Sequence, residues 1–114
     1  MNKEFIQNYG FGSIIIDNKK YTDDLILLKR KIIPHWWRDK GHHLQKSDLD
    51  KVLSFEPDVL IIGKGYYGRM KVPNNLVETL EFEVISAKTK KATKIYNQKL
   101  QKNKKIAGAF HLTC

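Results

Sequence analysis

DVLIIGKGYYG, residues 58–68, is the stretch of sequence that decides the fold. Its four branched apolar residues, 59–62, do not alternate with polar ones, which predicts a strand that is buried on both faces. Gly63, Gly65 and Gly68 then open a loop at the carboxyl end of this strand. Since open α/β sheets place their ligands at that end, the stretch predicts a covered central strand followed by a candidate binding loop.

Length and composition indicate one globular domain, residues 1–114. A chain of this length buries about two thirds of its unfolded surface, so one core suffices without disulfides or a metal. No apolar run approaches the roughly 20 residues of a membrane span, and the first residues contain no apolar signal segment. The single cysteine excludes an internal disulfide, which is typical of a reducing compartment. We therefore expect a cytoplasmic monomer or homodimer that makes no membrane contact.

The positive charge is concentrated in the last part of the chain. Lysine and arginine number 21 against 12 acids, a net charge of +9, yet the last acid is Glu83. The segment 84–114 holds eight lysines and predicts a basic face, which makes nucleic acid an alternative partner. The aromatic residues of this segment, Tyr96 and Phe110, are expected to point inward, so it offers no stacking platform for bases.

The first 46 residues predict antiparallel strands and a long loop. Strands at 11–16 and 20–22 flank the turn residues 17–19 and form a hairpin. Leu25–Leu28 reads as a further strand of the same meander. Residues 34–44 fit neither period and contain Trp36, Trp37 and three histidines. We expect at least one indole to pack onto the domain.

The remaining residues alternate between helices and strands. Ser47 and Asp50 match a capping box for a helix that Pro57 ends. After the central strand we expect a helix at 73–81, with Pro73 just inside it, and a strand at 83–86. A third helix capped by Thr89 and a strand at 106–113 follow. The inward residues of this third helix are Ala92, Ile95, Tyr96 and Leu100. This order predicts an α/β fold, a three-layer sandwich with a mixed central sheet and an N-terminal antiparallel hairpin.

The pattern Gly63-x-Gly65-x-x-Gly68 has three interpretations. A dinucleotide motif needs a helix that starts within the loop, but Pro73 delays the helix and Glu83 opens a strand, so we expect no cofactor. A tight turn with positive φ and close backbone packing explains the glycines without any ligand. The third interpretation is a nest of backbone amides that holds a small anion.

The histidines and the cysteine suggest two further sites. His111 and Cys114 could form a thiol–imidazole pair, but on a strand these positions point to opposite faces, so a buried structural cysteine is the simpler interpretation. His35, His42 and His43 lack the cysteine or carboxylate spacing of a metal site, so we expect no metal.

Three blocks of sequence occur together in a characteristic order. They are IIGKGYYG at 61–68, Thr89-x-x-Ala92-x-x-x-Tyr96-Asn97, and the ending His111-x-Thr113-Cys114. With a tryptophan and then a histidine in the loop 36–43, this combination resembles the Mth-type domain family over residues 11–114. That family includes archaeal and bacterial proteins of unknown function, the adipogenesis-associated Mth domain-containing protein and mitochondrial complex I assembly factor 3. The resemblance implies a three-layer α/β fold, no established catalytic activity and, for the mitochondrial member, action through protein contacts.

The recurring residues predict a ligand pocket at the carboxyl edge of the sheet. The glycine loop and Thr89 each follow a strand, and in a parallel arrangement both fall at that edge. The candidate pocket residues are Trp37, His43, Gly63, Gly65, Gly68, Thr89, Tyr96 and Asn97.

Three functions remain open on the sequence. The leading hypothesis is a non-catalytic binding or assembly module that contacts a protein partner or a small anionic ligand at the glycine-loop edge. The alternatives are a small enzyme that acts on an anionic substrate and a nucleic-acid accessory protein that uses the basic C-terminal segment.

Overall fold

The computed structural model describes residues 4–102 and 105–114 and shows two sheets with helices packed on the larger one. The strands are β1 (Ile6–Gly10), β2 (Ser13–Ile16), β3 (Lys19–Tyr21), β4 (Leu25–Leu28), β5 (Lys31–Pro34), β6 (Val59–Lys64), β7 (Glu83–Ala87) and β8 (Ile106–His111). The helices are the 3₁₀ helix η1 (Lys46–Leu49), α1 (Asp50–Phe55), α2 (Asn74–Val77) and α3 (Thr89–Leu100).

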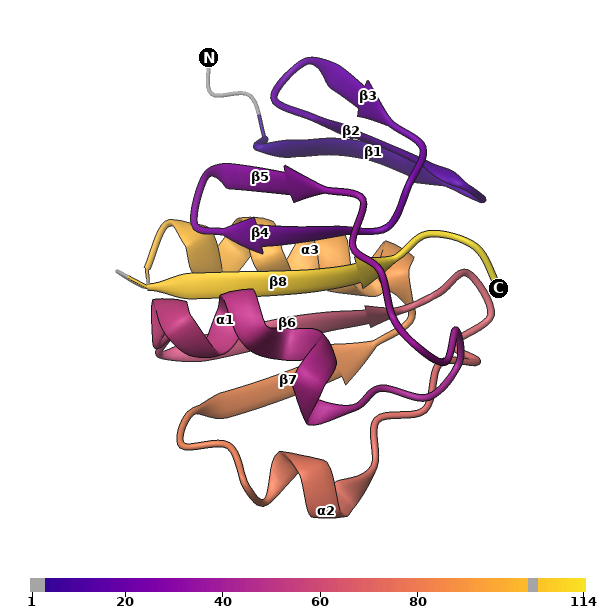
Figure 1. Cartoon of the computed structure of the whole chain (residues 1–114). Helices are drawn as coiled ribbons and strands as arrows, with labels where there is room; N and C mark the ends of the chain where they lie inside the picture. The colour runs from indigo at the N-terminus through magenta and orange to yellow at the C-terminus, as the bar shows by residue number, and fades with distance from the viewer. Residues whose placement is uncertain (1–3, 103–104) are drawn as a thin grey trace.

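Five strands form the central sheet in the order β5-β4-β8-β6-β7 (Figure 1). β6 is parallel to β7 and to β8, because the chain returns through a helical connection between successive strands. β4 is antiparallel to β8 and to β5, with which it forms a hairpin. Every residue of β8 is buried, as is every residue of β6 except Lys64. The mixed sheet and the covered central strand that the sequence predicts are therefore confirmed.

The two faces of this sheet have different covers. α1 lies on one face, while α3 and the sheet β1-β2-β3 lie on the other (Figure 1). The side chains of β6 divide accordingly: Ile61 packs in the cluster of Tyr96 from α3, and Leu60 and Ile62 pack in the cluster of Val52 from α1. This alternation confirms the predicted three-layer sandwich.

The strands at the front of the chain differ in part from the prediction. β2 and β3 form the predicted hairpin, and β1 adds a third strand that the sequence pattern did not reveal. Leu25–Leu28 does not belong to this meander, because β4 pairs with β5 and β8 in the central sheet. Its side chains fill both faces of that sheet, with Leu25 and Leu27 in one cluster and Ile26 in the other.

The helix starts also differ from the predicted caps. The 3₁₀ helix η1 comes before α1, and its N-cap is Gln45. The Gln45 N–H donates to Asp48 Oδ2 at 2.8 Å, so the capping box is formed by Gln45 and Asp48 and not by Ser47 and Asp50. α2 ends at Val77, before the boundary at residue 81 that the sequence predicts. α3 begins at Thr89, but Lys88 is its N-cap and the Thr89 hydroxyl bonds to other segments. No helix of the described residues is both long and apolar enough to cross a membrane.

Candidate functional site

The carboxyl ends of β6 and β8 lie at one edge of the sheet together with the start of α3. The Gly65 N–H donates to Thr89 Oγ1 at 2.8 Å, and this hydroxyl donates to the His111 carbonyl oxygen at 2.6 Å. A Cβ atom at Gly63 would lie 2.7 Å from the same Oγ1. The glycine loop, Thr89 and the end of β8 are therefore held together by a threonine that bonds to both strand ends.

The last three residues leave β8 and fold against the glycine loop. The Tyr66 N–H donates to the Thr113 carbonyl oxygen at 2.7 Å. Gly65 has a φ of 101°, and a Cβ there would lie 2.7 Å from that oxygen and 2.8 Å from His111 Cδ2. Only glycine permits both this φ and this approach, so Gly65 creates the space that the His111 ring occupies.

A polar cluster of Asp24, Arg38 and His111 lies beside the glycine loop. Asp24 Oδ2 is 2.7 Å from His111 Nδ1 and 2.8 Å from Arg38 Nη2. Asp24 Oδ1 accepts the Leu112 N–H at 2.7 Å, and Arg38 Nη2 also donates to the Gly41 carbonyl oxygen at 3.0 Å. The cluster therefore joins the segment before β4, the loop after β5 and the end of β8.

The chemistry of its two neighbours assigns a proton to His111 Nδ1. Arg38 Nη2 is 3.1 Å from this nitrogen, but a guanidinium has no acceptor to offer. The carboxylate of Asp24 is nearer, so Nδ1 carries a proton and donates it to Oδ2, which also accepts from Arg38. His111 Nε2 is then the ring atom that binds or releases a proton, or accepts from a donor.

Asp24 is the anion of the cluster. Burial on its own would raise the pKa of this carboxyl group, but the hydrogen bonds from His111 and the Leu112 N–H and the charges of His111 and Arg38 outweigh it, so the pKa lies below its ordinary value. Arg38 is only 9% exposed and His111 only 5%, so both side chains depend on this carboxylate. A buried guanidinium without such a partner would be strongly destabilising.

Two atoms of the cluster have no hydrogen-bond partner among the described residues. They are Arg38 Nη1 and His111 Nε2, and both are buried. An unpaired buried polar group costs about 1–3 kcal/mol. An anionic oxygen could accept from Arg38 Nη1, and a protonated His111 Nε2 could likewise donate to one, and either bond would offset this cost.

His42 and Cys114 lie next to the cluster. The His42 ring contacts the His111 ring edge to face, with 5.6 Å between the ring centres. Cys114 Sγ is 3.9 Å from His42 Nε2, which is hydrogen-bond range for sulfur. The thiol thus has His42 as its imidazole neighbour, and no hydrogen bond joins it to His111 among the described residues. Within that same part of the chain, no group of three or more side chains has the arrangement of a metal site.

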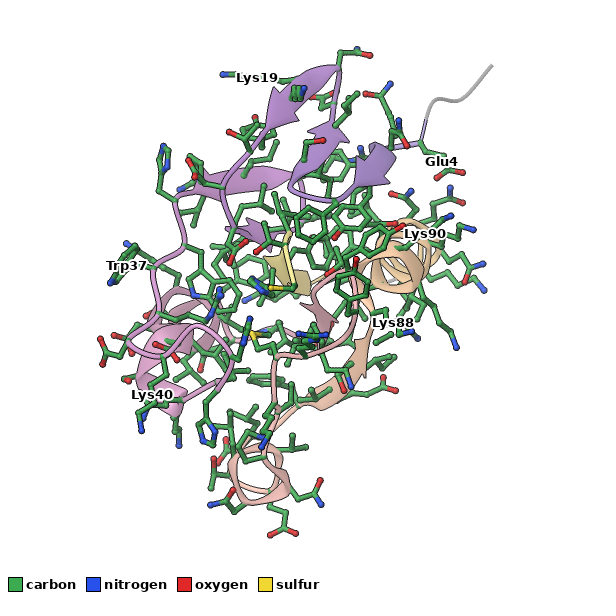
Figure 2. The ribbon with its side chains drawn as sticks, turned by 90° about the vertical axis from the view of Figure 1, so that its right-hand side faces the viewer. Glu4, Lys19, Trp37, Lys40, Lys88 and Lys90 are labelled. Carbon is green, nitrogen blue, oxygen red and sulfur yellow. The ribbon has the colours of Figure 1, made fainter. Side chains whose placement is uncertain are left out.

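The other predicted pocket residues at this edge lie in separate hollows. Trp37 is 86% exposed and borders a hollow of about 500 Å³ together with Asp24 and Arg38. Figure 2, which looks toward the carboxyl edge, places Trp37 at the margin of the molecule. His43 and Gly68 border a different hollow of about 470 Å³.

Tyr96 and Asn97 do not lie at the carboxyl edge. The Tyr96 ring is fully buried, and its hydroxyl donates to the Lys29 carbonyl oxygen at 2.7 Å, beyond the far end of β4. The Asn97 side chain exchanges two hydrogen bonds with the backbone of Ile6. Both residues hold α3 against the sheets.

Two residues of the polar cluster, Asp24 and Arg38, were not predicted from the sequence. The only local signals are that Asp24 directly precedes an apolar strand and that Arg38 directly follows two tryptophans. Trp36 packs inward beneath Arg38, whose guanidinium carbon is 4.5 Å from the ring centre, and its indole N–H donates to the Asp48 carbonyl oxygen at 2.8 Å. Trp36 is therefore the indole that packs onto the domain, as the sequence predicts for at least one of the two tryptophans.

The chain belongs to a family of proteins of unknown function. Residues 6–111 match the family model described as protein of unknown function (DUF498/DUF598), and the chain is a member of that family. It is similar to the conserved hypothetical protein PH1505 from Pyrococcus horikoshii OT3, with 30% identity and a TM-score of 0.77 over 96% of this chain and 98% of that one.

Two more distant structures show the same fold. The protein MT938 has 21% identity and a TM-score of 0.77 over 96% of this chain and 98% of that one. An Mth938-like domain from Bordetella pertussis has 14% identity and a TM-score of 0.70 over 96% of this chain and 85% of that one. The predicted membership of the Mth-type domain family is therefore confirmed.

Proposed function

We propose that this protein is a non-catalytic binding module that holds a small anionic ligand at the carboxyl edge of its central sheet. The observation that carries the proposal is the pair of buried, unpaired atoms Arg38 Nη1 and His111 Nε2. Both belong to side chains that Asp24 already holds in place. A ligand would therefore bind groups that need little reorganisation.

The charges of the cluster favour an anion over a neutral or cationic ligand. With His111 protonated, Arg38 and His111 carry two positive charges, and Asp24 carries one negative charge. The cluster then has a net positive charge in a buried site, where electrostatic interactions are stronger than in water. The exposed side chain of His42 contacts the His111 ring and adds a second imidazole beside the cluster.

An enzyme that acts on an anionic substrate is the alternative that the carboxylate–imidazole pair favours. Asp24 orients His111 as a carboxylate orients a general base. A covalent mechanism also needs a nucleophile within reach of Nε2, and among the described residues that atom has no hydroxyl or thiol partner. The binding role requires no such group, so we favour it.

A protein contact at the same edge is the other form of the binding hypothesis. Trp37 is 86% exposed, and a large exposed indole is typical of a contact residue in a protein interface. Trp37 lies in the hollow that Asp24 and Arg38 also border, so a partner could supply the anionic group from its own side chain.

The test is a titration of ¹⁵N-labelled protein with inorganic phosphate and with acetate, followed by imidazole ¹⁵N chemical shifts near pH 6.5. We expect a saturable shift of His111 Nε2. In His111→Asn the side-chain amide can still donate to Asp24 while Nε2 is lost, and we expect affinity to fall at least about tenfold, which is about 1.4 kcal/mol.

His43→Asn is the matched control, because His43 is exposed and borders a different hollow from the one that Asp24 and Arg38 line. This variant should bind as the parent does. A linear, non-saturable shift, or equal affinity in His111→Asn, would remove the anion site. Turnover of a phosphate ester or carboxylate ester that His111→Asn abolishes would replace the binding role with the enzymatic one.

A further inference from the structure

Three aromatic side chains form an exposed patch beside the glycine loop. Phe11, Tyr66 and Tyr67 are 54%, 44% and 55% exposed. Their ring centres lie 5.1–6.1 Å apart, and each ring contacts the other two. We call these residues the aromatic patch. The rings meet edge to face or tilted, so the aromatic patch presents several separate ring surfaces to solvent.

A groove between β1 and α3 continues from this patch. It has a volume of about 730 Å³. Tyr9 joins the two features, because its ring borders the groove and lies 6.3 Å from the Tyr66 ring. The Tyr9 hydroxyl is fixed by donation to the Leu112 carbonyl oxygen at 2.7 Å, and burial raises the pKa of Tyr9 to about 12. The ring is therefore held at the junction.

The charge along this track is positive. Lys90 and Lys94 border the groove, and Glu4 is the acid among its described lining residues. Arg69 lies over the Tyr67 ring at 5.4 Å, and the side chain of Lys88 lies against Gly68. None of the ion pairs found among the described residues involves these four cations.

Two of the cations can be placed relative to the rest of the molecule. Figure 2 shows Lys88 and Lys90 on the side of α3, opposite Trp37 and Lys40. The basic C-terminal segment alone has no exposed aromatic residue, since Tyr96 and Phe110 are buried. The fold supplies the missing stacking surface from two other segments, the turn between β1 and β2 and the glycine loop.

We propose that the aromatic patch and the groove together bind single-stranded RNA. Exposed rings stack on bases of any sequence, and a neighbouring basic groove follows the phosphates. Gln98 and Gln101 border the groove with exposed amides, which can donate to and accept from a ribose 2′-hydroxyl. A double helix would not offer its base faces to the aromatic patch.

An acidic peptide added as a strand to β1 fits this groove less well. The Ile6 N–H donates to Asn97 Oδ1 at 2.9 Å, and the Ile6 carbonyl accepts from Asn97 Nδ2 at 2.8 Å. The Tyr9 N–H donates to Asn8 Oδ1 at 2.9 Å. Strand addition needs free backbone groups along the edge, and these bonds already occupy them.

The experiment is a fluorescence anisotropy titration of the full chain with a labelled uridine oligomer of about 12 nucleotides, a length within the usual range for such sites. Tyr66→Leu/Tyr67→Leu keeps apolar side chains but removes the rings. Lys90→Glu/Lys94→Glu reverses the charge of the groove. Lys40→Glu/Lys51→Glu changes the net charge equally at exposed sites and is the matched control, because Figure 2 shows Lys40 opposite α3 and Lys51 belongs to α1, which covers the other face of the sheet.

We expect micromolar or tighter binding that weakens steeply with salt, and at least about a tenfold loss in each of the first two variants. The control variant should lose much less. Circular dichroism should show that all variants stay folded, because every substituted side chain is exposed.

Three results would overturn the proposal. The first is an equal loss in the Lys40→Glu/Lys51→Glu control, which would indicate a general charge effect. The second is equal competition by poly-glutamate of matched charge, which would indicate an acidic protein partner. The third is equal or tighter binding of deoxythymidine or duplex oligomers, which would exclude recognition of single-stranded RNA.

Discussion

Gly65 is the residue at which the carboxyl edge is most tightly packed. A Cβ there would lie within 2.9 Å of three atoms, two of them backbone carbonyl oxygens of the last residues. We predict that Gly65→Ala lowers the free energy of unfolding by about 2–5 kcal/mol, since it adds backbone strain of about 1–2 kcal/mol to overpacking of about 1–3 kcal/mol. The midpoint of urea denaturation measures this change.

Gly41→Ala is the control for that prediction. No atom lies within 4 Å of a Cβ at Gly41, and its φ is not positive. The variant should change stability by less than about 0.5 kcal/mol. If the two variants unfold at the same urea concentration, the approach of the C-terminal residues to Gly65 does not constrain the fold.

The residues of the site could be predicted only where a local sequence pattern indicates their place in the fold. Gly65 follows an apolar strand and Thr89 opens a helix, so both could be assigned to one edge from the sequence. Asp24 and Arg38 meet His111 only because three strands and a loop bring positions 24, 38 and 111 together. No pattern along the chain specifies that meeting, because it depends on strand order.

At the scale of elements, the alternation of helices and strands after residue 46 was sufficient for the parallel part of the sheet. Right-handed crossovers leave few arrangements for β6, β7 and β8. The place of β4 could not be inferred in this way: its unbroken apolar run favours a strand covered on both faces, but the run does not say whether its partners come from the neighbouring hairpin or from a distant strand. Its partner β8 comes from the other end of the chain and decides between them.

Asn97 connects two elements that the sequence analysis did not associate, α3 and β1. Its amide bonds to both backbone groups of Ile6, at 2.9 Å and 2.8 Å. We predict that Asn97→Ala lowers the free energy of unfolding by about 1–3 kcal/mol, because it leaves partly buried backbone groups without partners. Hydrogen exchange of the Ile6 N–H should also become faster.

The neighbouring Gln98 provides the control for this element. Its side chain is exposed on the same helix, so Gln98→Ala should leave both the stability and the Ile6 exchange rate unchanged. Equal exchange rates in Asn97→Ala and the parent protein would mean that β1 is held by β2 alone.

At the scale of the whole molecule, Asp24 is the point where distant segments converge. Asp24 lies between the small sheet and β4. Its carboxylate binds the loop after β5 through Arg38, and it binds the end of the chain through His111 and Leu112. One carboxylate thus stabilises contacts between three parts of the fold. Removing its charge should act on all of them at once.

The pH dependence of stability tests this role. In the folded protein the pKa of Asp24 lies below its ordinary value of about 3.9, so the unfolded chain binds the proton more tightly. Its contribution to stability is therefore complete above about pH 4 and is lost as the pH falls through the folded pKa.

We predict that Asp24→Asn is less stable than the parent by about 3–5 kcal/mol at pH 7, since Arg38 loses its buried counter-ion, and that this difference shrinks below pH 4. Asp23→Asn, which alters an exposed side-chain contact with His35, should cost less than about 1 kcal/mol. Urea denaturation at several pH values measures both, and a difference between Asp24→Asn and the parent that does not depend on pH would mean that the carboxylate charge does not hold these segments together.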